Sequence, residues 1–522
     1  MNSHVELNPD LTASVEKYRN AYPNKLEDSI ISISTEPFNH IIINSLFTES
    51  FPYEELIKEC HKSLNERKEN DIFSLSQSSD LEELSTDVFP LLNKFRTSII
   101  NEFRGVVSKM MGLEFDDKLT ITVSKYAKGD YLLCHDDQLE TRKVAFVYYL
   151  VKDGDFDASI DGGSLNLFSS KSIFSNTDSD FHPFQVEKSI SPKNNSLVLF
   201  EVSSRSFHEV SEILSDKERL SINGWFHGSV KVLERDLDFI NNVELIHPFD
   251  IEEEIFHKWI NKSFLLESTK EKMNTQFIDD SEIQLTCLFN EAVHRDLVKA
   301  LMSLGDGEWN RQLPHDFHRY SLLNKRLDSD DLTDLPDEIV QLYRLFASNI
   351  FQDFIGSFTN LNLNRSSQEE ASKSAKIPKL HTEQSLNPEA YLFNPKVRKW
   401  TRGDYIIMND PESDDPDLEA LSESESANFR LDALYHISGY GEEGDWKEEF
   451  GGQTIYTHKD EREPLLTVKP RNNTLSLVFV EDTVRPFVKY IRNQCTFHHL
   501  PNQESPDCFY DIQCTYFDHD AD

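Results

Sequence analysis

The sequence predicts an α+β protein made of two tandem double-stranded β-helix (jelly-roll) domains with supporting helices. Three observations predict this fold class: a block of short strand-like runs, helical periodicity on both sides of that block, and an internal repeat of strand-like segments. Short β-branched and aromatic runs that alternate with Gly, Asn and Asp clusters are typical of jelly rolls and barrels. We expect a first domain over residues 1–238 and a second over residues 239–522.

The first domain is expected to begin with helices and to continue as strands. Amphipathic stretches such as YEELIKECHKSL and VFPLLNKFRTSIINEFRGVVSKM predict that residues 1 to about 115 are mainly helical. Residues 119–228 contain short runs rich in β-branched and aromatic residues, which predict strands. In chain order these runs are LTITVSKYA, DYLLCH, KVAFVYYLV, GGSLNLF, NNSLVLFEV and RLSINGWFHG.

The second domain is expected to repeat this order of helices and strands. Amphipathic segments at residues 251–268 and 337–358 predict helices after about residue 235. A polar and acidic segment near residues 363–427 has the composition of a mobile loop. The remaining C-terminal part is strand-rich again, as the first domain is after its helices.

An internal repeat supports the two-domain prediction. The segment GDYLLCHDD (129–137) reappears as GDYIIMNDP (403–411), GGSLNLF as GGQTIYT, and SPKNNSLVLFEV as KPRNNTLSLVFV, in the same order along the chain. In the second copy Asn409 replaces His135 and Pro411 replaces Asp137. A copy that keeps the glycines and apolar strands but loses these polar residues indicates that they serve function rather than folding.

Composition limits the partners. The formal net charge of −39 would repel a phosphate backbone, so we expect no direct nucleic-acid partner, whereas a basic protein would be attracted. The alternative is that the acidic surface only keeps the protein soluble. No apolar run reaches the roughly 20 residues that a membrane span needs, and the N-terminus has no signal-peptide core, so we expect no membrane contact. These features predict a cytoplasmic and/or nuclear protein.

The six cysteines are dispersed and include no CxxC pair, which is typical of free thiols in a reducing compartment. A zinc site made from Cys495, His498, His499, Cys508 and Cys514 is the alternative. Their spacing matches no standard zinc pattern, so we do not favour this alternative.

His135 and Asp137 are the first two candidate metal ligands. Side chains alternate along a strand, so these two residues are expected to share one face while Asp136 points away. A His-x-Asp triplet is a weak signal by itself in a chain with 18 histidines. His208, in SFHEV, is the candidate third ligand, and Val488 takes its place in the second copy. Two histidines and one carboxylate are the facial triad of non-haem Fe(II) oxygenases, whereas structural zinc would need a fourth ligand.

A basic residue and two tyrosines complete the candidate site. Iron that activates O₂ needs two further electrons, which 2-oxoglutarate supplies, and its distal carboxylate requires a fixed cation. Arg219 lies on the next predicted strand after His208 and could bind this carboxylate through two hydrogen bonds, although a surface ion pair is the alternative. Tyr149 and Tyr126 could donate hydroxyls to the cosubstrate or simply pack in the core. Tyr148 should face the other way.

These motifs together resemble a known family. The pattern Y-x4-Y-x3-H-x-D in YAKGDYLLCHDD, followed by YYL, GGSLNLF, SFHEVSEIL and RLSINGWFHG, is similar to the prolyl hydroxylase branch of the 2-oxoglutarate- and Fe(II)-dependent oxygenases. Most closely it resembles the eukaryotic ribosomal prolyl 3-hydroxylases, which occur in yeasts and animals. That family joins a catalytic double-stranded β-helix to an inactive one, as the repeat with vacated ligand positions also suggests.

The resemblance implies specific roles and partners. His135, Asp137 and His208 would hold Fe(II), and Arg219 would bind 2-oxoglutarate with help from Tyr149 and Tyr126. O₂ would be the second cosubstrate and ascorbate a reductant. The implied substrate is a proline in a decoding-centre loop of a small-subunit ribosomal protein, hydroxylated at C3. Family members are also linked to translation termination and to oxygen sensing.

Two alternatives remain at this point. The same chemistry could act on another substrate, such as a lysine residue, a small molecule or an alkylated nucleic acid, the last being disfavoured by the net charge. Alternatively, the chain could be an oxygen-sensing regulator or a scaffold that binds a partner protein through its second domain. A protein that only binds a partner would have no reason to keep four polar residues at these spacings, namely His135, Asp137, His208 and Arg219.

Overall fold

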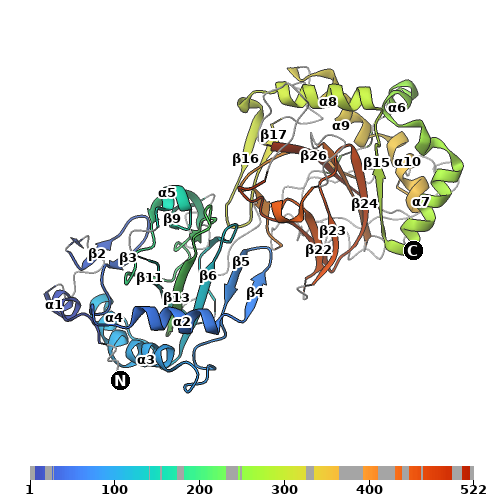
Figure 1. Cartoon of the computed structure of the whole chain (residues 1–522). Coiled ribbons are helices and arrows are strands. Elements are labelled where there is room, and N and C mark those ends of the chain that lie inside the picture. Colours follow the sequence, from blue (N-terminus) through green and yellow to red (C-terminus); the bar gives the residue numbers. More distant parts are fainter. Residues whose placement is uncertain are drawn as a thin grey trace. The chain divides into compact units, whose positions relative to one another are not determined.

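The computed structural model forms two compact units, shown as ribbons in Figure 1. The first comprises Met1–Asp236 with Pro314–Asp316, and the second comprises Leu237–Leu313 with Phe317–Asp522. No helix among the described residues is long and apolar enough to cross a membrane. The described residues are 6–17, 26–27, 29–139, 141–152, 156–172, 181–230, 245–246, 248, 250–324, 334–363, 392–408, 429–437, 446–459, 463–495 and 508–517.

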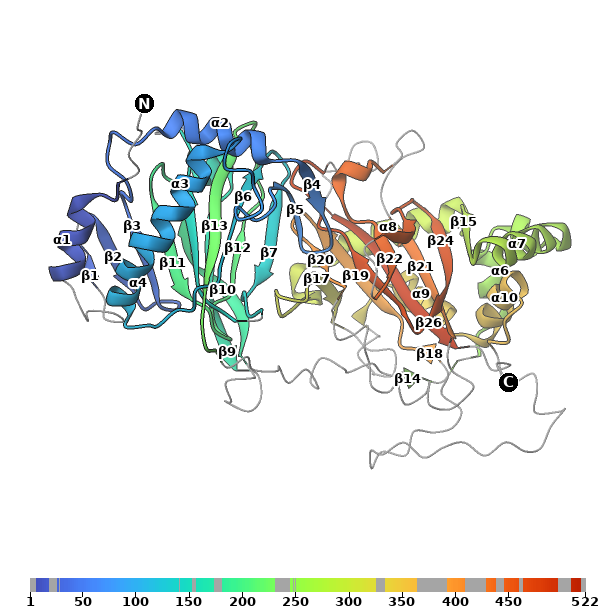
Figure 2. The same ribbon diagram turned by 90° about the horizontal axis from the view of Figure 1, so that it is seen from below.

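Helices α1 to α4 pack on one side of an antiparallel sheet in the first unit (Figure 2). The helices are α1 (Pro9–Lys17), α2 (Tyr53–Ser63), α3 (Pro90–Ser98), a π-helical turn (Ile99–Phe103), α4 (Arg104–Met111) and α5 (Ala158–Asp161). The strands are β1 (Leu26–Glu27), β2 (Ile31–Ser34), β3 (His40–Ile43), β4 (Glu66–Glu69), β5 (Phe73–Gln77), β6 (Leu119–Tyr126), β7 (Tyr131–His135), β8 (Arg142–Tyr149), β9 (Leu165–Ser172), β10 (Phe181–Ile190), β11 (Leu197–Glu201), β12 (His208–Val210) and β13 (Arg219–His227).

The prediction that residues 1 to about 115 are mainly helical is wrong. Five strands, β1 to β5, lie in this region between the helices. The segments ISIS (31–34) and HIII (40–43) pair with each other, and the second of them also pairs with β11. Pairing with distant strands therefore decides their conformation, which the local sequence cannot show.

The first sheet has two buried faces with different contents. One face, which includes Ile121, Phe146, Tyr148 and Leu199, packs in the core under α1 to α4. On the other face, Tyr149 and its neighbours are also buried, because the sheet curls around them. We call the second face the inner face. Tyr148 and Tyr149 thus lie on opposite faces, as strand alternation predicts.

The second unit repeats this plan, and the helices predicted after about residue 235 are confirmed. Its helices are α6 (Glu253–Trp259), a 3₁₀ turn (Lys262–Leu265), α7 (Glu267–Asp280), α8 (Glu291–Ser303), a 3₁₀ turn (Asp306–Glu308), α9 (Asp337–Phe346), α10 (Asn349–Thr359) and a 3₁₀ turn (Glu448–Phe450). Its strands are β14 (Leu245–Ile246), β15 (Glu282–Thr286), β16 (Trp309–Gln312), β17 (His318–Leu323), β18 (Leu392–Phe393), β19 (Lys396–Thr401), β20 (Tyr405–Ile406), β21 (Phe429–Ile437), β22 (Thr454–His458), β23 (Pro464–Val468), β24 (Thr474–Glu481), β25 (Val484–Val488) and β26 (Cys508–Phe517).

The acidic loop expected near residues 363–427 is described only at residue 363 and over 392–408, where β18, β19 and β20 lie; the rest of it is outside the described residues.

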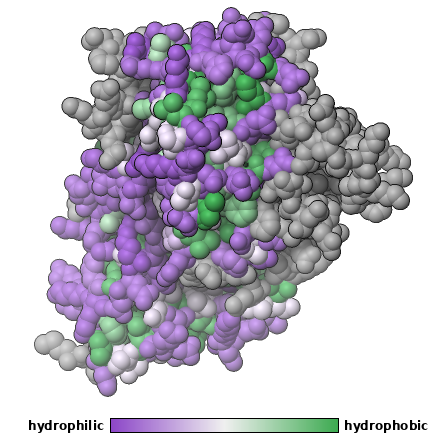
Figure 3. Space-filling model, turned by 90° about the vertical axis from the view of Figure 1, so that its right-hand side faces the viewer, coloured by the Kyte–Doolittle hydropathy of each residue, from purple (hydrophilic) through white to green (hydrophobic). Residues whose placement is uncertain are grey.

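All six cysteines are free thiols. His498 and His499 of the alternative zinc site are outside the described residues. On the side of the molecule that bears α6, α7 and α10, hydrophilic side chains predominate and hydrophobic ones appear between them (Figure 3).

The strands of the two sheets follow the same order. The first sheet contains β3-β11-β8-β13-β6-β5-β7-β12-β9-β10, and the second contains β15-β24-β21-β26-β19-β17-β20-β25-β22-β23, with all pairs antiparallel. Asn195 and Asn473 occupy equivalent turns in a left-handed conformation, with φ of 57° and 51°. Each accepts a hydrogen bond from the hydroxyl of an equivalent tyrosine, Tyr148 or Tyr435. The repeated segments therefore form equivalent structure in the two units.

One equivalence differs from the prediction. Val488 pairs with β20 in the register in which Val210 pairs with β7, so Val488 is not the counterpart of His208. Pro486 takes that place instead. The prediction places a two-residue shift between the copies after the strand NNSLVLFEV and its repeat. In the structure the spacing from this strand to the next is the same in both copies. The side chain of a proline has no atom that could bind a metal.

The Gly-Gly turn before β9 and β22 yields a stability prediction. Gly162 and Gly451 have positive φ, and a Cβ atom at either position would collide with a backbone carbonyl oxygen, that of Glu212 or Tyr490. Replacing either glycine by Ala should lower the free energy of unfolding by about 3 kcal/mol or more. Chemical denaturation measures this. The control is Gly105→Ala inside α4, where a Cβ meets no atom, and which should be neutral or stabilise by about 0.5–1 kcal/mol.

Candidate metal and cosubstrate site

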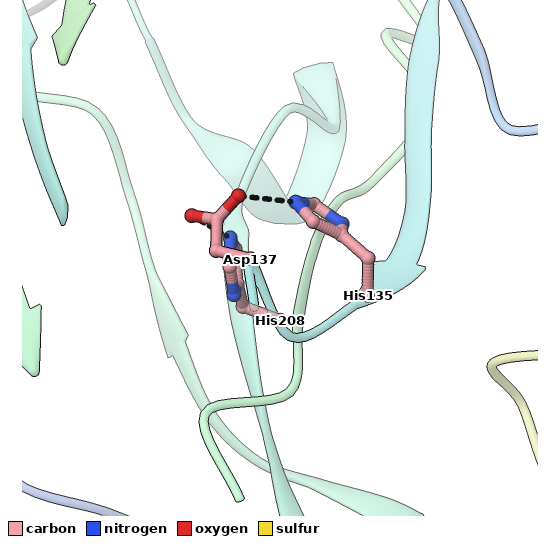
Figure 4. A group of neighbouring side chains, drawn as sticks. All are labelled: His135, Asp137 and His208. Atoms are coloured by element: carbon pink, nitrogen blue, oxygen red, sulfur yellow. Dashed lines mark ion pairs between the residues drawn. The ribbon is translucent and has the colours of Figure 1, made fainter. Parts of the chain in front are cut away.

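Strand pairing brings the three predicted metal ligands together (Figure 4). His135 ends β7, His208 begins β12, and these two residues are direct partners in the antiparallel ladder. Asp137 follows two residues after β7, and its carboxylate oxygens lie 3.5 Å from Nε2 of each histidine. One ligand atom from each of the three residues lies within 4.8 Å of the other two. This spacing suits a single metal ion.

The side chains of His135 and Asp137 lie close together, but the expectation that they share the face of one strand is wrong. The strand ends at His135, and Asp137 has a left-handed backbone conformation with φ of 65°. This turn, rather than strand alternation, brings the carboxylate back beside the His135 imidazole. Non-glycine residues with positive φ are uncommon and Asp is among those that tolerate it, which is consistent with a functional position.

Backbone hydrogen bonds set the tautomers of both histidines. Nδ1 of His135 lies 2.8 Å from the carbonyl oxygen of Leu133, and Nδ1 of His208 lies 2.7 Å from that of Ser206. Because a carbonyl only accepts, each Nδ1 carries the proton and donates. Each Nε2 therefore faces Asp137 with the atom that can bind a metal.

The charges at this site also suit a metal cation. Burial, followed by the charge of His135, lowers the pKa of His208 to about 4, so His208 is neutral near pH 7. Burial acts to raise the pKa of Asp137, but its close contacts with His135 and His208 outweigh this and hold the pKa well below its usual range. Asp137 is therefore an anionic ligand. Two imidazole nitrogens and one carboxylate oxygen fit Fe(II).

Two residues that sequence reasoning missed also contact Asp137. Trp225 donates a hydrogen bond from Nε1 to Oδ2 at 3.0 Å, and Arg142 lies 3.4 Å from Oδ1. The guanidinium of Arg142 stacks 3.7 Å from the centroid of the Trp225 ring. The sequence does contain a signal for Trp225, because it lies an even number of residues after Arg219 on β13 and therefore faces the same side of the sheet. Partners of this kind orient a metal ligand and fix the direction of its lone pairs.

Arg219 lies on the same inner face and is 1% exposed, which excludes the surface ion pair. Its Nε donates to the carbonyl oxygen of Gly163 at 2.9 Å. Its guanidinium carbon lies 5.0 Å from the ring centroids of both Tyr126 and Tyr149. No carboxylate among the described residues forms an ion pair with it. A buried cation without a protein counter-charge is costly, so this position suits a bound anion.

The two tyrosines are placed to assist such an anion. Tyr126 is the direct ladder partner of Arg219, and the Tyr149 hydroxyl lies 3.5 Å from the guanidinium. Burial raises the pKa of Tyr126 to about 12, although Arg219 acts in the opposite direction. Burial also raises the pKa of Tyr149. Both hydroxyls therefore stay protonated and can donate hydrogen bonds.

Two family models match the chain. The model described as "2OG-Fe(II) oxygenase superfamily" matches residues 121–227, which contain all six predicted site residues. The model described as "Oxoglutarate and iron-dependent oxygenase degradation C-term" matches residues 251–521. The first match lies in the first unit, and the second match lies in the second unit except for residues 314–316.

Curated relatives match over most of their length. "Prolyl 3-hydroxylase OGFOD1" of Xenopus laevis is 31% identical over 94% of this chain and 89% of its own. The mouse protein of the same name is 29% identical over 89% of this chain and 86% of its own. "Prolyl 3-hydroxylase sudestada1" of Drosophila melanogaster is 28% identical over 86% of this chain and 77% of its own.

The first prediction from this geometry concerns metal binding. Replacing Asp137 by Ala removes the only anionic atom among the three, so Fe(II) affinity should fall at least about 100-fold. Anaerobic calorimetry with Fe(II), or with redox-stable Mn(II), measures this. Asp136→Asn is the matched control and should bind normally, because the Asp136 carboxylate instead accepts from Gln138. Unchanged affinity in the Asp137 variant would contradict the assignment.

The second prediction concerns 2-oxoglutarate. Arg219→Gln should raise the apparent KM for 2-oxoglutarate at least about 100-fold, because the charge pair between the guanidinium and the cosubstrate is lost. Arg219→Lys should raise it less, because lysine restores the charge but cannot donate the two parallel hydrogen bonds of a guanidinium. Succinate production at varied 2-oxoglutarate concentration measures this. Lys217→Gln, two residues away and paired with Asp161, is the control. Equal KM values in wild type and Arg219→Gln would exclude this role.

Proposed function

Because this chain belongs to the prolyl 3-hydroxylase family of 2-oxoglutarate- and Fe(II)-dependent oxygenases, we propose that it hydroxylates C3 of a proline in a small-subunit ribosomal protein. It is a prolyl hydroxylase that uses Fe(II), 2-oxoglutarate and O₂. The observation that carries the reaction class is the buried and uncompensated Arg219 on the same inner face as His135, Asp137 and His208.

The residues of the first unit have distinct parts in this chemistry. When bound, Fe(II), 2-oxoglutarate and O₂ together supply the oxidant, with loss of CO₂ and formation of succinate. His135, Asp137 and His208 would hold the metal through three atoms and leave its other positions open. Arg219, with Tyr149 and Tyr126, would bind the distal carboxylate and so fix the direction of the cosubstrate. Ascorbate would act as a reductant.

The wall of the inner face protects this chemistry. Phe200 packs edge-on against the His208 ring, with 4.7 Å between centroids, and Phe38 packs against Phe200 at 5.6 Å. Leu167 lies opposite His208 in the ladder with β9 and is fully buried. These apolar side chains exclude water from one side of the metal site, which limits side reactions of the oxidant.

For the second unit we propose a double-stranded β-helix that lacks metal ligands, with the domain boundary near residue 238. Register supports this: Pro486 stands in the place of His208, and Phe509 in the place of Arg219. In sequence, Asn409 and Pro411 replace the other two ligands, but both lie outside the described residues. Such a domain would bind a regulatory protein or help to hold the substrate.

The basic character of ribosomal proteins agrees with the net charge of −39, because opposite charge speeds their encounter. Modification at the decoding centre would affect translation termination and accuracy, and dependence on O₂ would permit oxygen sensing. We propose residence in the cytoplasm, the nucleus or both. The competing candidates are another protein substrate and a regulatory scaffold.

Mass spectrometry tests the substrate proposal. The full chain with Fe(II), 2-oxoglutarate and ascorbate should add one oxygen to a single proline of the decoding-centre ribosomal protein, and amino-acid analysis should identify 3-hydroxyproline. His135→Ala is the inactive control. Succinate without modified protein would exclude this substrate but keep the oxygenase. Neither succinate nor hydroxyproline, with Fe(II) still bound, would favour the scaffold.

A further inference from the structure

The inner face of the second sheet contains polar side chains at the place where the first unit has its cosubstrate residues. On β21, Tyr435 packs under the helices, whereas the next residue, His436, points to the opposite, inner face. His436 pairs with Asp511 of β26 in the register in which Tyr149 pairs with Ser221 of β13. His436 is thus the structural counterpart of Tyr149.

Two more inner-face residues follow from the same register. Trp400 pairs with Phe509 as Tyr126 pairs with Arg219, so Trp400 is the counterpart of Tyr126. Ser476, on β24, lies diagonally across from His436 on the same face, since it pairs with the residue two positions earlier. His436, Ser476 and Trp400 all lie on one buried surface, and each is at most 1% exposed.

These three side chains carry four polar atoms with no hydrogen-bond partner among the residues that the structure describes. They are Nδ1 and Nε2 of His436, Oγ of Ser476 and Nε1 of Trp400. Buried polar atoms in folded proteins are almost always hydrogen-bonded, and an unpaired one needs an explanation. Four of them on one surface, in the counterpart of a ligand-binding region, point to a ligand rather than to packing.

The charges around these atoms are already balanced. Arg398, which faces the same interior, donates from Nε and Nη2 to the two carboxylate oxygens of Asp511 at 2.8 and 2.7 Å. Both residues are buried. Burial lowers the pKa of His436 to about 4, so this imidazole is neutral near pH 7 and offers one donor and one acceptor. A second pair, Asp432 with Arg430 at 3.5 Å, lies on the same face of β21, so the surface has no net charge to attract an anion.

We propose that the inner face of the second unit binds an uncharged small molecule with both hydrogen-bond donors and acceptors, of which a carboxamide is the simplest example, through His436, Ser476 and Trp400. The serine hydroxyl would donate to its oxygen, the acceptor nitrogen of His436 would receive its N–H, and the indole N–H would donate to a further acceptor of a larger ligand. This site does not depend on the proposed function of the first unit. It would make the second unit a ligand-binding domain that no longer takes the dicarboxylate.

Histidine side-chain NMR of the full ¹⁵N-histidine-labelled chain, with acetamide as the probe, tests this proposal. The ring nitrogens of His436, identified by their loss in His436→Phe, should shift in a saturable manner with a Kd of about 10 mM or tighter. Ser476→Ala should weaken this binding about tenfold while it leaves the fold intact. Acetate, which has the same shape but a negative charge, should cause no saturable shift.

His294 provides the internal control. It is a second buried histidine of this unit, but its ring nitrogens are bonded to the Tyr435 hydroxyl at 2.7 Å and the Asn472 side-chain oxygen at 2.8 Å. Its signals should not respond to acetamide. No saturable shift of His436 would overturn the proposal and leave ordered water as the partner of these atoms. Equal shifts of both histidines, or tighter binding of acetate than of acetamide, would also overturn it.

Discussion

The antiparallel pairing of β12 with β7 is the constraint on which the candidate metal site depends, because it sets His208 directly opposite His135. A slip of one residue would turn His208 away from the inner face. The strand β12 has only three residues, so it cannot fix this register alone. Its second neighbour, β9, and the Gly162–Gly163 turn that approaches the Glu212 carbonyl hold it in place. The positions of the three candidate metal ligands are thus a consequence of packing outside the site.

Comparison of the two units shows which features belong to the shared backbone and which belong to the candidate site. In both units a buried aspartate just before β7 or β20 pairs with an arginine of a neighbouring hairpin. The pairs are Asp130 with Arg67 and Asp404 with Arg311. Both units also keep the same asparagine and glycine turns. The differences lie on the inner face, where Pro486 stands in the register position of the candidate ligand His208. The repeated backbone can therefore carry different contents, which supports arguing function from the inner-face residues and not from the fold.

The sequence was sufficient where local pattern and chemistry agree. The strand runs between residues 119 and 228 correspond to β6, β7, β8, β9, β11 and β13, because each has clear β-branched or aromatic character. It was insufficient for β10, FHPFQVEKSI, whose proline and charges hide an edge strand with two register shifts. The turn at Asp137 and the indole of Trp225 depend on backbone geometry and cross-strand neighbours, which a single sequence does not contain. The tautomers of the histidines likewise follow from backbone carbonyls that only the fold brings near.

The two inner faces differ most in how each treats a buried arginine. In the first unit Arg219 is surrounded by tyrosines and has no carboxylate partner among the described residues, so the free energy of its burial is recovered only when an anion binds. In the second unit Asp511 neutralises Arg398 with two hydrogen bonds. The first interior therefore suits a bound anion, whereas the arginine of the second interior already has its counter-charge. The two arginines lie at different register positions, because Phe509 stands in the place of Arg219 and Arg398 stands in the place of Ser124. Asp511, in the place of Ser221, adds the carboxylate that neutralises the second arginine.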